Sequence, residues 1–197
     1  NVGFSPGASG TISVLGAGSA FGTGGALSIG GNISGPGGMG GLAIDYGGAV
    51  SASVLNVWNT GTLGLDHGAT INAATTTIDA PVIVGEGGAS IEGDLVLTPA
   101  SQTIVGVAAG SSGLAVSGTA ALSGVLTIEF YSAVTPGPYT LIEADGGLGG
   151  STFASVSVTP PADMTAAVTY DDTHVYLVLA STVDDDLVFR DGFDGTP

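Results

Sequence analysis

Short apolar triplets recur roughly every six or seven residues through the middle of this chain, starting near Val57. They occupy residues 63–65, 69–71, 76–78, 82–84, 89–91, 95–97 and 103–105. Glycine, asparagine, aspartate or proline fills most of the gaps between them. Each triplet is too short for a helix, and its alternating apolar residues are typical of a strand that buries one face. The pattern therefore predicts a series of short strands.

The spacing of the triplets predicts how these strands are arranged. Three strands with their corners make a turn of roughly 20 residues, the size of repeat that stacks into a β-solenoid. A meandering β-sandwich is the alternative, but its turns should come about every 8 to 12 residues. The observed spacing is tighter, so we expect an all-β solenoid. It predicts three columns of stacked side chains: Val57, Ile78 and Leu97; Leu65 and Val84; Ile71 and Ile91.

Composition is compatible with a folded core. Of 197 residues, 44% are hydrophobic, and most of the 36 glycines alternate with valine, isoleucine and leucine as corner residues would. The Gly-rich stretch 16–48 could be loose, although residues 27–29 and 42–44 fit the strand pattern. We therefore divide the chain into an N-terminal strand with Gly-rich coils (1–48), a regular solenoid (49–135), a capping β unit (136–182) and an acidic tail (183–197).

Charge restricts the partners of the chain. A single basic side chain, Arg190, stands against 17 acidic ones, and the formal net charge is −16. Such a chain cannot hold phosphate groups by charge, so we expect no binding to nucleic acid or to anionic membranes. The absence of lysine excludes Schiff-base chemistry on a lysine. The acidic excess favours cationic partners, including calcium.

The chain also lacks cysteine and long apolar runs. Without cysteine the chain has no disulfide and no thiol nucleophile. Without a long apolar run, we expect no membrane span. No signal-peptide pattern is present at the start. The low charge content and the many small residues suit an exported bacterial protein of the cell surface or extracellular space. On that expectation, Asn1 is the end left after removal of a signal peptide.

The pattern changes after the Thr-Pro-Gly-Pro sequence at 135–138. Longer strands are predicted at 139–142, 153–158, 166–170 and 175–179, and residues 171–174 form a hairpin-like link. With Gly149, Phe153 and Val156, these segments resemble the end unit of bacterial autotransporter passenger domains over residues 136–180.

The resemblance implies a right-handed parallel β-helix on the cell surface, closed by a C-terminal β cap. A cap is also needed physically, because an open end exposes apolar side chains and unpaired strand edges. Only residues 181–197 follow this unit, so we expect no membrane β-barrel after it. Part of this tail, including Leu187, Phe189 and Phe193, resembles a short terminal motif of some secreted gammaproteobacterial proteins, which implies export and attachment by other means.

The two terminal segments are the predicted assembly contacts. Tail residues Leu187, Val188, Phe189 and Phe193 would add a strand or plug to a neighbouring copy, and Arg190 would pair with an acidic residue there. The complementary contact is the N-terminal strand, with Ile12 and Val14. This head-to-tail contact would propagate instead of closing.

Catalytic and metal-binding patterns are weak. Asp66 and His67 could form a proton relay, but they precede Gly68 at a predicted corner, where a solvated turn is the preferred interpretation. The same holds for His174. Weak calcium candidates are Asp171, Asp172, Asp184 and Asp186. Calcium needs about six to eight oxygen ligands, and these aspartates lack EF-hand spacing, so we expect no cofactor, with calcium left open.

Paired carboxylates raise the possibility of a polysaccharide-degrading enzyme. Glu92 could pair with Glu86 or Asp94, as glycosidases require. A polysaccharide lyase needs an arginine or lysine base, and the only candidate is Arg190 in the tail. We therefore expect no enzymatic activity.

The sequence predicts a non-enzymatic extracellular structural protein that self-assembles into a surface filament, fibre or matrix. A monomeric adhesin or glycan-binding stalk that contacts a host surface is the alternative, and a polysaccharide-degrading enzyme is the second alternative. Aromatic residues could stack on sugars, although scattered aromatics more often belong to a core or an interface. They are Tyr46, Trp58, Phe130 and Tyr131.

Overall fold

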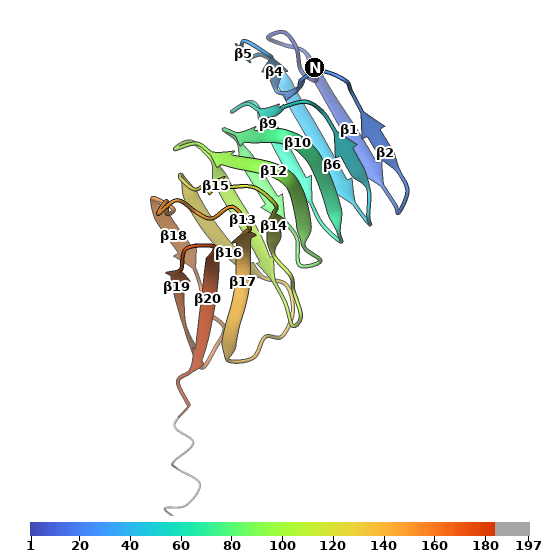
Figure 1. Cartoon of the computed structure of the whole chain (residues 1–197). Helices are drawn as coiled ribbons and strands as arrows, with labels where there is room; N and C mark the ends of the chain where they lie inside the picture. The colour runs from blue at the N-terminus through green and yellow to red at the C-terminus, as the bar shows by residue number, and fades with distance from the viewer. Residues whose placement is uncertain (184–197) are drawn as a thin grey trace, which may run out of the picture.

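The computed structural model describes residues 1–183, which form an all-β structure. The strands lie across the length of the molecule and are stacked along it, with β1 and β2 at one end and β18 to β20 at the other (Figure 1). This range contains no helix that is long and apolar enough to cross a lipid bilayer.

Two large sheets and one small sheet contain all the described strands. The seven-stranded sheet has the order β1 (Ser9–Leu15), β6 (Met39–Asp45), β9 (Gly61–Leu65), β11 (Pro81–Val84), β13 (Gln102–Val107), β16 (Val125–Phe130) and β18 (Ser155–Val158). The main path of the eleven-stranded sheet is β19 (Met164–Tyr170), β20 (His174–Ser181), β17 (Gly137–Ala144), β14 (Leu114–Val116), β12 (Ala89–Leu97), β10 (Ala69–Ile78), β7 (Ala49–Ser51) and β2 (Ala20–Gly22). Beside this path lie β3 (Leu27–Ile29), β8 (Leu55–Val57) and β15 (Ala120–Ala121), and the small sheet is β4 (Gly31–Asn32) with β5 (Gly35–Pro36).

From β1 to β18, apart from the small sheet of β4 and β5, strands pair with one another in parallel, each with a strand about one turn away in the sequence. In the seven-stranded sheet, Leu42 pairs with Leu63, which pairs with Val82. Val82 pairs with Thr103, which pairs with Leu126. Each step is roughly 20 residues, the predicted length of a turn. This parallel pairing contradicts the meandering sandwich, in which neighbouring strands pair antiparallel.

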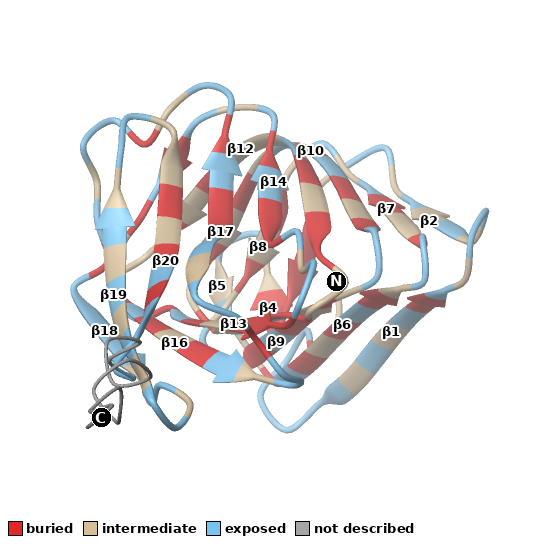
Figure 2. Cartoon of the chain, turned by 90° about the horizontal axis from the view of Figure 1, so that it is seen from below, coloured by how far each residue is buried: buried red, intermediate tan, exposed pale blue. Residues whose placement is uncertain are grey.

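The predicted columns of stacked side chains are confirmed. Ile78 pairs with Val57 on one side and with Leu97 on the other. Val84 pairs with Leu65, and Ile71 pairs with Ile91. All seven side chains are buried. Figure 2 shows the same alternation as bands of buried and more exposed residues along the strands.

One corner differs from the expected pattern. The triplets at 69–71 and 76–78 lie in the single strand β10, and those at 89–91 and 95–97 lie in β12. The two strands change register between Asn72 and Thr75. Gly93 faces this irregularity with φ at +133°, and a Cβ there would lie 1.9 Å from the Ala73 carbonyl oxygen. The strand therefore bends from one face to the next without a break, which only glycine permits at this position.

The C-terminal strands form the predicted hairpin. β19 and β20 pair antiparallel, with Tyr170 opposite Val175, and β20 pairs antiparallel with β17. Val175 and Leu177 of β20 are buried, and Val168 of β19 packs partly buried against the core. The hairpin lies at this end of the stack (Figure 1), and its apolar side chains pack into the core.

Strands of the N-terminal Gly-rich stretch belong to the same large sheets as the regular part of the chain. β2 pairs with β7, and β3 pairs with β8, both in parallel. The three residues of β3 are fully buried. β1 is the last strand of its sheet and pairs only with β6 among the described residues. The stretch that composition allowed to be loose therefore forms the first turn of the stack.

The columns predict a large difference between two isoleucines of the same turn. Ile91 points inward from β12 and is fully buried, whereas Ile83 points outward from β11 and is 45% exposed. Ile91→Ala should lower the free energy of unfolding by about 2–5 kcal/mol, because it removes a methylene group and two methyl groups from a closed column. The matched control, Ile83→Ala, should cost less than about 1 kcal/mol in urea denaturation. Equal losses would contradict the assignment of the inward columns.

Candidate functional site

Polar side chains gather at the corner that follows β6 and β9. Asp45 ends β6, and Asp66 and His67 follow β9, so the pairing of Ile44 with Leu65 brings the two aspartates to neighbouring turns. His67 Nδ1 lies 3.0 Å from Asp45 Oδ1 and 3.2 Å from Asp66 Oδ2.

Backbone amides occupy part of these carboxylates. Asp45 Oδ1 accepts the Tyr46 N–H, and Asp66 Oδ1 accepts the N–H groups of His67 and Gly87. Tyr46 and His67 both adopt positive φ values, 51° and 45°, and their rings stack with centroids 4.6 Å apart. Aspartate side chains stabilise such turns by accepting nearby amides. Stabilising these turns is therefore a sufficient structural role for both aspartates.

Within residues 1–183, this corner contains the only group of three histidine, cysteine, aspartate or glutamate side chains close enough together to hold a metal ion. One ligand atom each from Asp45, Asp66 and His67 lies within 4.8 Å of the others. Imidazole nitrogen and carboxylate oxygen suit zinc and similar divalent ions. An Nδ1–H group donating to both carboxylates fits the same distances, so the geometry does not require a metal.

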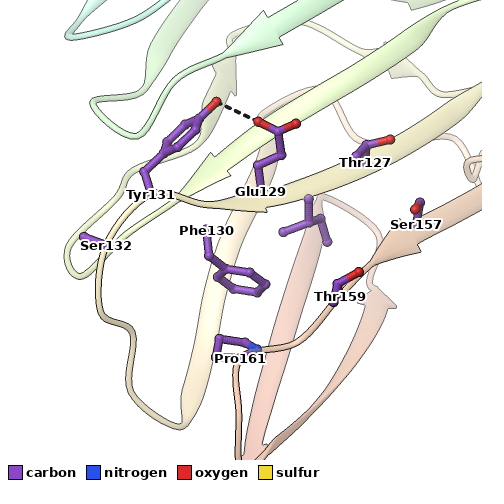
Figure 3. Close-up of a pocket in the computed structure, with 9 residues that line it drawn as sticks. Thr127, Glu129, Phe130, Tyr131, Ser132, Ser157, Thr159 and Pro161 are labelled. Carbon is purple, nitrogen blue, oxygen red and sulfur yellow. Dashed lines mark hydrogen bonds between the residues drawn. The ribbon is translucent and has the colours of Figure 1, made fainter.

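A second candidate site is an open hollow of about 620 Å³ beside the end of β16. It forms because β18 ends at Val158, immediately before Thr159, Pro160 and Pro161, while β16 continues to Phe130. Proline cannot donate to a sheet, so strand pairing stops there. Figure 3 shows that Tyr131, Glu129 and Thr127 lie on one side of the β16 ribbon and Phe130 on the other, facing Pro161.

Tyr131 is held in place at this hollow. Its hydroxyl donates to Glu129 Oε2 at 3.1 Å (Figure 3). A Cβ at Gly106 would lie 2.2 Å from Tyr131 Cε2, so the ring position requires glycine on the neighbouring strand. Partial burial, the bond to Glu129 and the charges of Glu129, Asp66 and Glu86 raise the pKa of Tyr131. The hydroxyl therefore keeps its proton at neutral pH. The residue as a whole is 51% exposed.

The three candidate carboxylates of a glycosidase have different surroundings. Glu92 lines a hollow of about 290 Å³ with Glu143 and Asp145, whereas Glu86 lines a different hollow beside His67. Asp94 accepts the Thr119 amide at 2.7 Å and the Thr119 hydroxyl at 2.9 Å, and these hydrogen bonds lower its pKa. Asp94 thus stabilises a turn.

Two of the calcium candidates lie in the hairpin turn. Asp171 Oδ1 accepts the amides of Thr173 and His174, and His174 Nδ1 lies 3.1 Å from the same oxygen. These contacts, led by the Thr173 amide, lower the pKa of Asp171 to about 2. Asp172 beside it is exposed. Asp171 is therefore used in holding the turn, and Asp184 and Asp186 lie outside the described residues.

Of the predicted assembly residues, those of the N-terminal strand lie within the described residues and those of the tail do not. Val14 is buried and Ile12 is half-buried, and both pack into the core from β1. Their side chains are therefore not a free surface, although the strand that carries them is at the edge of its sheet. The tail residues Leu187, Val188, Phe189, Arg190 and Phe193 lie outside the described residues.

Several site residues were not identified from the sequence. The offset of about 20 residues, applied to Asp66, would have placed Asp45 beside His67. No comparable signal predicts the neighbours of Glu92, because the chain between β14 and β17 is longer than one regular turn. The hollow at Tyr131 depends on where β18 leaves β16, which spacing alone does not determine.

Comparison of the chain with models of known protein families gives no match, and comparison with curated protein sequences gives none either. The fold and the sites are therefore interpreted from this chain alone.

Acid should weaken the hairpin through Asp171. The folded pKa of about 2 lies below the ordinary value of 3.8, so the charged carboxylate stabilises the fold above about pH 4. This stabilisation is lost as the pH falls from about 4 to 2. Asp171→Ala should therefore lower the melting temperature at pH 6, and the difference from the unsubstituted protein should shrink towards pH 2. A difference that stays constant with pH would contradict this role.

Proposed function

We propose that this chain is a non-enzymatic, extracellular structural protein that associates with copies of itself through the open edge of β1. The observation that carries the proposal is the contrast between the two ends of the stack. At one end the hairpin of β19 and β20 extends the eleven-stranded sheet, and the terminal strand of the other sheet, β18, has four residues. At the opposite end the terminal strand, β1, has seven residues and one neighbour among residues 1–183. A strand with unpaired amides and carbonyls is a template for another strand.

Successive residues of β1 direct their backbone N–H and C=O groups to opposite sides of the strand. The Gly16 amide donates to the Asp45 carbonyl, and the Met39 amide donates to the Ala8 carbonyl. Because bonding groups alternate along a parallel strand, Ile12 and Val14 direct their amides and carbonyls at β6. Thr11 and Ser13 direct theirs at the open edge. These are the groups that a partner strand would pair with.

The partner is a second copy of the chain. Each copy has a formal net charge of −16, so two copies repel one another electrostatically, and pairing of backbone groups with burial of apolar side chains must supply the affinity. The acidic surface keeps such a protein soluble before it assembles. The tail residues 187–189 and Phe193 remain the predicted donor, with Arg190 beside an acidic residue of the neighbour.

The winding itself is that of a right-handed β-solenoid. Crossover connections between parallel strands of one sheet are right-handed in nearly all proteins. Such crossovers connect the parallel strands β6, β9 and β11 here. The resemblance of residues 136–180 to autotransporter end units favours the same hand and a place on the cell surface. A long stack with a continuous core and no disulfide suits a stalk, filament or matrix.

Proline in the open edge tests the proposed contact. Ser13→Pro removes the Ser13 amide from the edge and leaves the bonds to β6 in place. We expect the unsubstituted protein to form assemblies in negative-stain microscopy, and Ser13→Pro to form none and to scatter light as a monomer. The control, Ser13→Ala, keeps the amide and should assemble normally. If Ser13→Pro melts near the unsubstituted temperature and still forms the same assemblies, the β1 edge is not the contact.

Deletion of residues 184–197 tests the donor separately. The truncated chain keeps every described strand, so its melting temperature should change little. It should remain monomeric, because the segment that is predicted to pair with the neighbouring β1 is gone. Assemblies formed at the same concentration as by the full chain would show that another segment is the donor.

A further inference from the structure

We propose that the hollow beside β16 and β18 binds an uncharged glycan chain, with the Tyr131 ring as the stacking surface and Glu129 as the main hydrogen-bond acceptor. This site is separate from the β1 edge and does not depend on self-association. Its volume of about 620 Å³ lies within the range of known ligand sites, about 300–1,000 Å³.

The lining has the chemistry that sugars require. Tyr131 is an aromatic residue that is 51% exposed, and sugar rings pack their C–H faces against aromatic rings. Hydroxyl groups of Thr127, Ser157 and Thr159 line the same hollow (Figure 3). The Glu129 carboxylate can accept charge-assisted hydrogen bonds from sugar hydroxyls. One stacking face and several polar groups therefore meet in a single place.

The ring is fixed before any ligand arrives. Gly106 leaves the space in which the Tyr131 ring lies, and the hydroxyl is tied to Glu129. A side chain that is already held in one position loses little conformational entropy on binding. Tyr46 differs in that its ring stacks on His67 and does not line this hollow.

Charge and backbone geometry argue against other occupants. Residues 1–183 contain no lysine or arginine, and Glu129 lies in the hollow, so an anionic polymer would be repelled. A peptide strand would need a row of free backbone groups. The amides of Val125 and Tyr131 donate to the Ser101 and Val107 carbonyls on the β13 side, so within β16 only Phe130 directs its backbone at the hollow. One residue is too few for strand addition.

The experiment measures binding of defined hexasaccharides to the full chain by isothermal titration calorimetry. The neutral probes are cellohexaose, β-1,4-galactohexaose and N-acetylchitohexaose, and the anionic comparison is hexagalacturonate. At least one neutral probe should bind with a Kd in the micromolar to millimolar range, and hexagalacturonate should bind at least about tenfold more weakly.

Variants locate the site. Tyr131→Ala should weaken binding about tenfold or more, because the stacking surface is lost, whereas Tyr131→Phe keeps the ring and should retain most of the affinity. Glu129→Gln should weaken binding several-fold. The control, Tyr46→Ala, removes a similarly exposed tyrosine that does not line this hollow and should leave the Kd unchanged. Melting temperatures identify any variant that fails to fold.

Three results would overturn the proposal. One is that no neutral probe binds at millimolar concentration. The second is binding that folded Tyr131→Ala retains in full. The third is equally tight binding of hexagalacturonate.

Discussion

Stacking of inward side chains from one turn onto the next is the interaction on which the rest of this structure depends. Each turn is too small to bury its own apolar face, so columns such as Ile71 with Ile91 exclude water only because neighbouring turns cover them. The chain has no cysteine that could replace this core with disulfides. Removing one turn would therefore expose two others.

This dependence separates the inner and outer faces of the strands. Most inward positions hold apolar residues, with a few small polar ones such as Thr76 and Thr103, while polar and charged side chains lie on the outer face and at the corners. Asp45, His67 and Tyr131 all occupy outer positions or corners, where their contacts form between neighbouring turns. A binding site on the described surface can therefore combine residues of one strand, such as Glu129, with residues about 20 or more positions away, such as Ser157.

The sequence predicts the regular part of the fold well, because stacking imposes a visible repeat. The columns through Val57, Ile71 and Leu65 follow directly from that repeat. The first turn was harder to predict, since glycines between residues 16 and 48 interrupt the alternation that marks a strand. The hollow at Tyr131 could not be predicted, because two prolines end β18 at a point that only the paired structure defines. The position of Asp45 beside His67 could have been predicted, because Asp45 and Asp66 are about one turn apart in the sequence.

The central claim is that β1 is an open edge which a second copy of the chain occupies. Residue-resolved hydrogen exchange by NMR tests it directly, because neighbouring amides of one strand should behave differently. At low concentration, the Thr11 and Ser13 amides should exchange quickly while those of Ile12 and Val14, which bond to β6, are protected. At high concentration all four should be protected. Exchange of Thr11 and Ser13 at the same fast rate in assembled and dilute protein would contradict the account.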